Sequence, residues 1–291
     1  MKPGTNWIRD TLLLGLVCAA PLVHGQATLY WTGAGDGVRL DLDTNWDPPG
    51  LPQPNDLMVW DGRTTSNLFL TFVTGNIQGA FGQLGRDIYL TSNQVNAVTF
   101  YGAVGTQFAI RMNNITIEPG AGPFTFGLPG TNLIDVIWGG QGGQTHTLIN
   151  DSAHPATLNA EVRIRYGGGG AHTLLFGGSG DWVVNHHLRA DNNSPTIITK
   201  QGSGRLIWTR VNVARFDSPI QGPLTVEDGT LVLKSPNLLE GMTGAQTINI
   251  NAGTLEYDAP DGGRILSLRS ERRGHVARPQ RHIDALRCRH L

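Results

Sequence analysis

Short apolar runs recur along the chain between clusters of Gly, Asn, Asp and Pro. Several runs alternate with a period of two, as at Leu231 and Leu233 or at Ile248 and Ile250. Such a period buries one face of a strand. Because no long window after residue 25 has helical spacing, the pattern predicts an all-β protein with tight turns. The expected strands are 68–73, 97–101, 115–118, 162–166, 172–176, 182–184, 196–199, 224–227, 230–233, 248–251 and 254–257.

The expected strands repeat at about 24 residues. The aligned segments, with their offsets, are 178–182 with 202–206 (24), 204–206 with 229–231 (25), 229–231 with 253–255 (24), and 146–148 with 172–174 (26). A near-constant period predicts a solenoid, in which each coil buries its apolar face by stacking on the next. We expect an interior column whose members each follow a glycine turn. Its members are Trp182, Leu206, Leu231 and Leu255. A β-sandwich with chance similarities between its turns is the alternative.

Segments 198–208 and 222–233 carry a recognisable motif. Their sequences, ITKQGSGRLIW and GPLTVEDGTLVL, resemble the autotransporter-associated β-strand repeat, and segment 250–257 is similar to its Gly-Thr-Leu half. A weaker similarity to the opening segment of such proteins lies in Tyr30-Trp31-Thr32-Gly33, Asn45-Trp46, Pro54, Asp56 and Trp60-Asp61. The resemblance implies a right-handed parallel β-helix, export, a surface role in a Gram-negative-type bacterium, and no catalytic residues. The structural motif residues are Lys200, Gly202, Gly204, Leu206, Gly229, Leu231, Gly253 and Leu255.

The chain departs from this family at its end. An autotransporter ends in an outer-membrane barrel, which needs roughly 100 residues, whereas 34 residues follow Tyr257. We therefore expect no translocator barrel and no C-terminal sorting segment.

The N-terminus has the pattern of an export signal. Lys2 and Arg9 flank an uncharged apolar stretch at 11–23, and cleavage is expected after Gly25. The stretch is too short to span a bilayer. The expected organisation is a signal peptide at 1–25, a capping segment with Trp and Asp at 26–62, a solenoid at 63–263 and an Arg-rich tail at 264–291.

Composition narrows the function classes. Charged residues make up 15% of the chain, with 39 Gly and 16 Pro, which excludes a coiled coil. The mildly acidic body does not suggest a nucleic-acid surface. Cys18 leaves with the signal peptide, so Cys288 has no partner for an intrachain disulfide.

The tail at 264–291 holds eight Arg and two acids, without a strand pattern. Three interpretations stay open: a disordered basic tail touching acidic polysaccharide or lipid, a frame artefact in a truncated repeat protein, and a metal site at His282, Cys288 and His290. The last matches no zinc spacing.

Candidate chemistry elsewhere is sparse. An acidic cluster at Asp36, Asp41, Asp43, Asn45 and Asp47 resembles the start of a Ca²⁺ loop but lacks its Gly and Glu, so turn and cap chemistry is favoured. No other cofactor is expected.

Histidines, carboxylates and tryptophans give no clear site. His186 and His187 favour a surface pair, because adjacent strand residues face opposite ways. His146 and His172 lie at repeat spacing and are expected to stack. Asp151, Glu161 and Asp181 do not recur at the repeat offset, which argues against catalysis. The residues Trp182 and Trp208 are expected in the core, and packing in the cap is favoured for the four earlier tryptophans of the mature chain, Trp31, Trp46, Trp60 and Trp138.

The sequence thus predicts an exported, non-catalytic β-solenoid with a structural or adhesive role at the cell surface or outside the cell; the periplasm is also open. Its expected partners are surface polysaccharides or glycans of host or neighbouring cells. The alternatives are a polysaccharide lyase or glycoside hydrolase, and a glycan-binding module.

Overall fold

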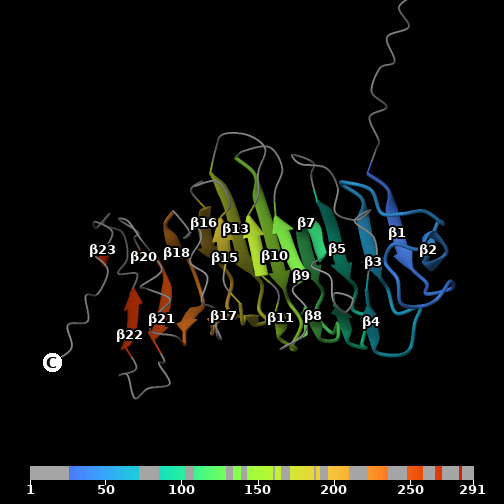
Figure 1. Cartoon of the computed structure of the whole chain (residues 1–291). Helices are drawn as coiled ribbons and strands as arrows, with labels where there is room; N and C mark the ends of the chain where they lie inside the picture. Colours follow the sequence, from blue (N-terminus) through green and yellow to red (C-terminus); the bar gives the residue numbers. More distant parts are fainter. Residues whose placement is uncertain are drawn as a thin grey trace, which may run out of the picture.

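Successive coils of the chain add strands to two stacked parallel sheets, as the computed structural model shows (Figure 1). The structure describes residues 26–71, 85–101, 108–128, 134–138, 143–159, 161–164, 171–186, 188–190, 196–209, 222–234, 248–257, 266–270 and 282–283. In this part of the chain the only helical element is the 3₁₀ turn η1, Asp43–Asn45. The fold is a β-solenoid, which confirms the predicted fold class. The expected signal peptide lies outside the described residues.

The first sheet runs the length of the solenoid. In spatial order its main path is β2 (Trp46–Asp47), β1 (Thr28–Trp31), β3 (Leu57–Trp60), β5 (Arg86–Leu90), β7 (Phe108–Ile117), β10 (Thr145–Asn150), β13 (His172–Gly177), β16 (Thr196–Lys200), β18 (Leu224–Val226), β20 (Ile248–Ile250) and β23 (His282–Ile283). Strands β1 and β3 of the expected capping segment are already parallel rungs of this sheet.

Within the described residues, the second sheet has nine strands. In sequence order they are β4 (Leu68–Leu70), β6 (Val98–Phe100), β8 (Phe124–Phe126), β11 (Ala156–Leu158), β14 (Trp182–Val184), β17 (Arg205–Trp208), β19 (Thr230–Leu233), β21 (Gly253–Tyr257) and β22 (Leu266–Ser270). Neighbouring strands are parallel from β4 to β21.

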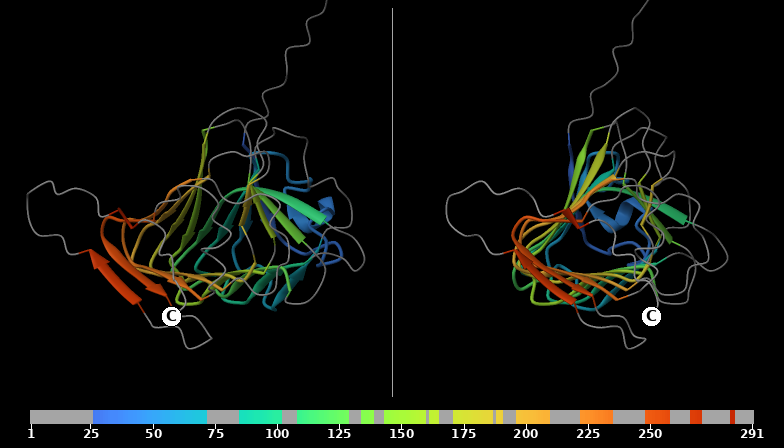
Figure 2. Two further views of the ribbon diagram at one scale, coloured as in Figure 1. Left: turned by 60° about the vertical axis from the view of Figure 1, so that its left-hand side comes forward. Right: turned by 90° about the vertical axis from the view of Figure 1, so that its left-hand side faces the viewer.

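A third, shorter wall branches from β7. Residues 115–117 of this strand pair with β10, whereas residues 108–112 pair with β9 (Ile134–Trp138). The strands β12 (Glu161–Ile164) and β15 (Leu188–Ala190) continue that wall in parallel. Figure 2 shows the strands enclosing one interior.

The register of the second sheet follows the sequence alignment. Trp182 is opposite Leu206, Leu206 is opposite Leu231, and Leu231 is opposite Leu255. All four side chains are buried. The offsets of 24, 25 and 24 residues are therefore the true spacings of adjacent coils.

The upstream alignment is wrong by two residues. His146 is opposite Leu174 rather than His172, so the offset between β10 and β13 is 28 residues and not 26. The coil that contains β10 and β11 is longer than the later coils, because additional residues lie between its strands. The repeated His-Thr-Leu triplet is not a register marker.

The buried hydrophobic side chains of the described residues form one cluster of inward-facing columns. In the second sheet Leu70, Phe100 and Phe126 occupy one such column and are fully buried. Parallel stacking places each of these side chains roughly 4.8 Å from its neighbour along the axis. Trp182 and Trp208 are core residues, as expected.

Three tryptophans close the N-terminal end. Trp31 packs edge-on against Trp46 with ring centroids 5.1 Å apart, and Trp60 stacks on Trp31 at 6.4 Å. The exposed fractions of the three residues are 1–2%. The Trp46 Nε1–H donates to the Leu40 carbonyl oxygen at 3.0 Å. These three tryptophans pack in the cap, as predicted. The side chain of Trp138 lies outside the described residues.

The Arg-rich segment contributes two strands that its sequence pattern did not predict. β22 pairs antiparallel with β21, and β23 pairs antiparallel with β20. Within the described ranges, no helix is both long enough and apolar enough to cross a bilayer.

Candidate functional site

The candidate site is the corner where each coil passes from the first sheet to the second. There are four consecutive corners in this part of the described chain. They are 178–181 between β13 and β14, 201–204 between β16 and β17, 227–229 between β18 and β19, and 251–252 between β20 and β21. Most of the predicted motif residues lie in or beside these corners. The structure thus stacks corners that span 74 positions of the sequence, from residue 178 to residue 252.

Glycine is required in the corners because successive corners stack too closely for a side chain. Gly202 has a φ of +71°, and a Cβ atom there would lie 2.5 Å from the Gly178 carbonyl oxygen. A Cβ atom on Gly229, at a φ of +68°, would overlap the Gly202 carbonyl oxygen. Both the backbone conformation and the close approach therefore favour glycine.

Lys200 is buried inside the corner of its own coil. It occupies an inward position of β16, between Phe176 of the preceding coil and Val226 of the following one, and only 1% of it is exposed. Its Nζ donates to the carbonyl oxygens of Gln201 at 2.6 Å and Gly202 at 2.7 Å. These bonds give the buried ammonium the partners that it needs in an apolar interior.

The same ammonium reaches the next coil. Lys200 Nζ lies 3.5 Å from the Asp228 carbonyl oxygen. Burial lowers the pKa of Lys200 to about 8, although the negative charges of Asp228 and Asp181 oppose this change. Lys200 therefore links two adjacent corners through their backbone carbonyls.

Asn150 has the same role two coils earlier. Its Nδ2 donates to the His154 carbonyl oxygen at 3.0 Å, within its own corner, and to the Asp181 carbonyl oxygen at 2.8 Å, in the next. The residue is fully buried. Asn150 was not predicted from the sequence. The one available signal is a polar residue at an inward position just before a corner, as at Lys200.

Carboxylates bridge the corners from outside. Asp151 Oδ1 accepts the Ser179 N–H at 2.9 Å, and Asp181 Oδ1 accepts the Arg205 N–H at 2.8 Å. Each bond joins one coil to the next. The two acids considered for catalysis at these positions are therefore engaged with backbone amides; the side chain of Glu161 lies outside the described residues.

The opposite end of the second-sheet strands has a polar ladder. Asn185 Nδ2 donates to Asn159 Oδ1 at 2.7 Å, and the Thr209 hydroxyl donates to Asn185 Oδ1 at 2.6 Å. Three consecutive coils are thus joined by side chains at one position. This ladder was not predicted from the sequence.

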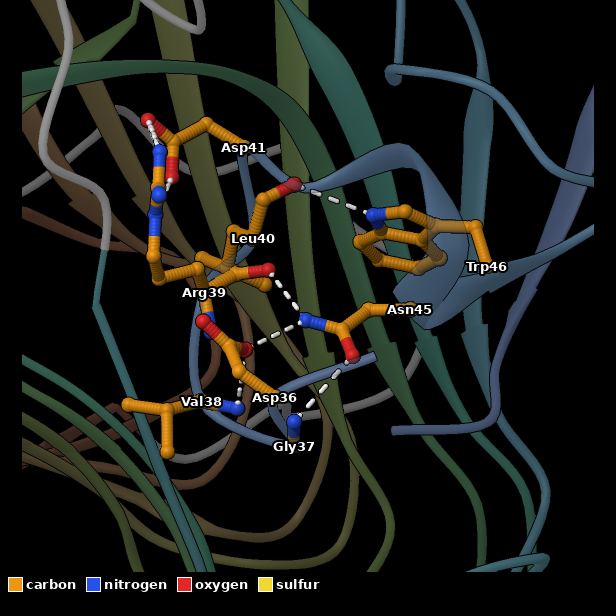
Figure 3. Close-up of polar contacts among 8 residues, drawn as sticks. All are labelled: Asp36, Gly37, Val38, Arg39, Leu40, Asp41, Asn45 and Trp46. Atoms are coloured by element: carbon orange, nitrogen blue, oxygen red, sulfur yellow. Dashed lines mark hydrogen bonds and ion pairs between the residues drawn. The ribbon is translucent and has the colours of Figure 1, made fainter. Parts of the chain in front are cut away.

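The acidic N-terminal cluster serves its own loop (Figure 3). Asp36 Oδ1 accepts the N–H groups of Val38 and Arg39, both at 2.9 Å, and Asn45 Nδ2 at 2.8 Å. Burial opposes ionisation, but these hydrogen bonds lower the pKa of Asp36. Asn45 Oδ1 in turn accepts the N–H of Gly37 at 3.1 Å.

The other acids of this cluster have separate partners. Asp41 pairs with Arg39 at 3.1 Å, and Asp47 pairs with Arg63 at 2.6 Å. Asp43 Oδ1 accepts the Thr44 N–H at 2.8 Å. The predicted turn and cap chemistry is therefore present. Across the described residues, no three His, Cys, Asp or Glu side chains gather as a metal-binding group.

The stacking of His146 and His172 is confirmed. Their rings are 5.6 Å apart with an interplanar angle of 17°, and both residues are fully buried. His146 Nδ1 lies 3.2 Å from the Asn113 carbonyl oxygen, a distance at which a protonated Nδ1 donates. Burial and the neighbouring His172 lower the pKa of His146 to about 4. His186 is half-buried, and His187 lies outside the described residues, so the expected surface pair stays a prediction.

Comparison of the chain with protein-family models, with curated proteins and with solved structures finds no match.

Proposed function

We propose that this protein is an exported, non-catalytic β-solenoid that acts as a structural or adhesive passenger at the cell surface or outside the cell. On this proposal the molecule is a stiff rod, and its function is to hold a surface at a fixed distance from its point of attachment. Export rests on the apolar stretch at 11–23 with its basic flank.

The observation that carries the proposal is the use of polar side chains to join coils. Lys200, Asn150 and Asp181 each bond backbone groups of a neighbouring coil, and Asn185 bonds the side chains of two neighbours. A catalytic or binding group must leave atoms available to a substrate. Because the polar atoms of these side chains bond the neighbouring coil, they favour a structural role.

One surface favours glycan binding as a second candidate. Tyr30, Val59 and Tyr89 are opposite one another on three successive strands of the first sheet, and the two tyrosines are half-buried while Val59 between them is buried. The guanidinium of Arg63 lies 4.5 Å from the centre of the Tyr30 ring, and the Tyr89 hydroxyl bonds Glu118. Aromatic rings held beside charged groups can stack on a sugar and bond its hydroxyls.

Surface display tests the proposed function. The full chain would be expressed in a Gram-negative host, with fractionation, N-terminal sequencing and protease treatment of intact cells. We expect cleavage after Gly25 and adhesion of cells that display the protein. Adhesion should be lost in Leu231→Asp and kept in Leu231→Ile. A chain that stays uncleaved in the cytoplasm would contradict export.

Two assays on the purified protein separate the alternatives. Release of reducing sugar or unsaturated products from polysaccharides would contradict the non-catalytic proposal and support a lyase or hydrolase. Binding to a glycan array without turnover, weakened by Tyr89→Ala and kept in Tyr89→Phe, would support the glycan-binding module. Neither signal is expected from a spacer alone.

A further inference from the structure

Both sheets change from parallel to antiparallel pairing at the last coil. β21 is parallel to β19 on one side, but on its other side β22 runs antiparallel to it over five residue pairs, from Gly253 opposite Ser270 to Tyr257 opposite Leu266. In the first sheet, β23 likewise pairs antiparallel with β20 over two residues. A further coil would have paired in parallel, so β22 occupies the position where the next rung would lie.

The edge of β21 that β22 covers has backbone groups available for pairing with a strand. The Thr254 N–H donates to the Gly229 carbonyl oxygen at 2.8 Å, so Thr254 directs its backbone groups toward β19. Backbone groups alternate in direction along a strand, and Leu255 therefore directs its N–H and C=O toward β22. Among the parallel strands of the second sheet, Leu255 is the last member of the interior column. Without β22, β21 would expose an open strand edge beside the end of the core.

A second copy of β21 fits this edge. A two-fold axis at Leu255 would set Leu255 opposite Leu255 of the other copy, and Thr254 opposite Glu256. No like charges then face each other, and Glu256 is already paired with Arg205 at 3.1 Å. Such an interface is isologous and closed, which is the commonest symmetry of protein dimers.

We propose that the β21 edge is a self-association surface that β22 keeps closed, and that displacement of β22 lets two copies pair antiparallel through β21. The partner is a second copy of this chain. β22 shows that β21 accepts an antiparallel strand along its whole length.

Proline substitution in the full chain opens the edge selectively. Leu268 is opposite Leu255, whose backbone faces β22, so the two form a hydrogen-bonded pair and Leu268→Pro removes a donor from the ladder. Ser267 is opposite Glu256, whose backbone faces β19, so Ser267→Pro removes no ladder donor and is the matched control. Light scattering after size exclusion should show dimers of Leu268→Pro that increase with concentration, and monomers of Ser267→Pro and of the wild type.

A charge at Thr254 tests the pairing itself. In the Leu268→Pro protein, Thr254→Glu would set one carboxylate opposite Glu256 of the other copy, so that each dimer would contain two such like-charge pairs. The dimer dissociation constant should rise about tenfold relative to Thr254→Gln. A monomeric Leu268→Pro protein with wild-type circular dichroism would overturn the proposal, as would equal dimerisation of Ser267→Pro or no difference between Thr254→Glu and Thr254→Gln.

A disulfide lock gives a second test that does not depend on proline. Thr254 and Arg269 are opposite each other in a non-hydrogen-bonded pair, which brings their Cα atoms to about 4.5 Å, within the range that a disulfide spans. The variant Thr254→Cys, Arg269→Cys, Cys288→Ser would be studied in urea below its unfolding transition. The reduced protein should dimerise and the oxidised protein should not. Equal behaviour of the two forms would contradict a closed edge.

Discussion

The Nζ atom of Lys200 donates a hydrogen bond to the Gly202 carbonyl oxygen at 2.7 Å, inside a corner where only glycine fits. The two residues act together in the corner. Gly202 allows the corners to stack closely, and its carbonyl oxygen and that of Gln201 both accept hydrogen bonds from Lys200. Lys200 then supplies the donor that those oxygens need.

Replacement of Lys200 by Met should destabilise the fold. The change keeps the length of the side chain but leaves the Gln201 and Gly202 carbonyl oxygens without this donor. We expect a loss of about 2 kcal/mol in the free energy of unfolding, measured by urea denaturation followed by circular dichroism. Gln201→Met, at the exposed neighbouring position, should change it by less than about 0.5 kcal/mol. Equal stabilities of the two variants would show that the Lys200 bonds contribute nothing.

A comparison of alanine substitutions at Gly143 and Gly202 distinguishes the cost of backbone strain from the cost of steric overlap. Gly143 has a φ of +86°, and a Cβ atom added there would have no neighbour within 4 Å. Gly202 has a similar φ, but a Cβ atom added there would lie 2.5 Å from the Gly178 carbonyl oxygen. Gly143→Ala should cost about 1 kcal/mol, from the left-handed conformation alone. Gly202→Ala should cost at least about 3 kcal/mol, because the stacked corners must also separate. Thermal melts of both variants measure the difference, and similar shifts would argue against close corner stacking.

Acid should destabilise the protein through His146. Its pKa is about 4 in the fold, against 6.5 for an unperturbed histidine, so the unfolded chain binds more protons between these values. This contribution to stability is complete above pH 6.5 and is lost as the pH falls toward 4; it amounts to about 3 kcal/mol.

The variant His146→Leu isolates this effect, since leucine stands at the paired position 174. Its free energy of unfolding should fall less steeply between pH 6.5 and 4 than that of the wild type. Parallel pH profiles for the two proteins would show that His146 is not the titrating group.

The interior column should not tolerate a charge. Leu231 is fully buried between Leu206 and Leu255. Leu231→Asp places an unpaired carboxylate there and should cost at least about 4 kcal/mol, enough to remove the cooperative melt. Leu231→Ile should cost less than about 1.5 kcal/mol. An unchanged melt and circular dichroism spectrum for Leu231→Asp would contradict the stacking register.

The sequence predicted the part of the fold in which the coils repeat regularly. The Gly-x-Leu spacing located Leu206, Leu231 and Leu255 in one column, because coils of nearly equal length repeat the same turn. His146 and His172 were misaligned by two residues because their coil is longer. The antiparallel β22 follows no repeat, so periodicity could not reveal it.

The site was only partly predictable. Lys200 is visible in the motif, but its carbonyl partners are backbone atoms, which carry no sequence signal of their own. Asn150 also donates to backbone carbonyl oxygens of its own corner and the next, but its segment lacks the motif. The same hydrogen-bonding role is therefore filled by a different residue type, which a sequence repeat does not reveal.

A spin-label distance tests the central claim, that successive coils stack in one parallel ladder. Five rungs separate Phe69 from Ile207 on the outer face of the second sheet, through Thr99, Thr125, Thr157 and Val183. Labels on Phe69→Cys and Ile207→Cys, with Cys288→Ser, should therefore lie about 24 Å apart, at roughly 4.8 Å per rung, apart from the added length of the labels. A narrow distribution near that value is the predicted result. A distribution centred far from it, as the alternative β-sandwich pairing would give, would contradict the solenoid.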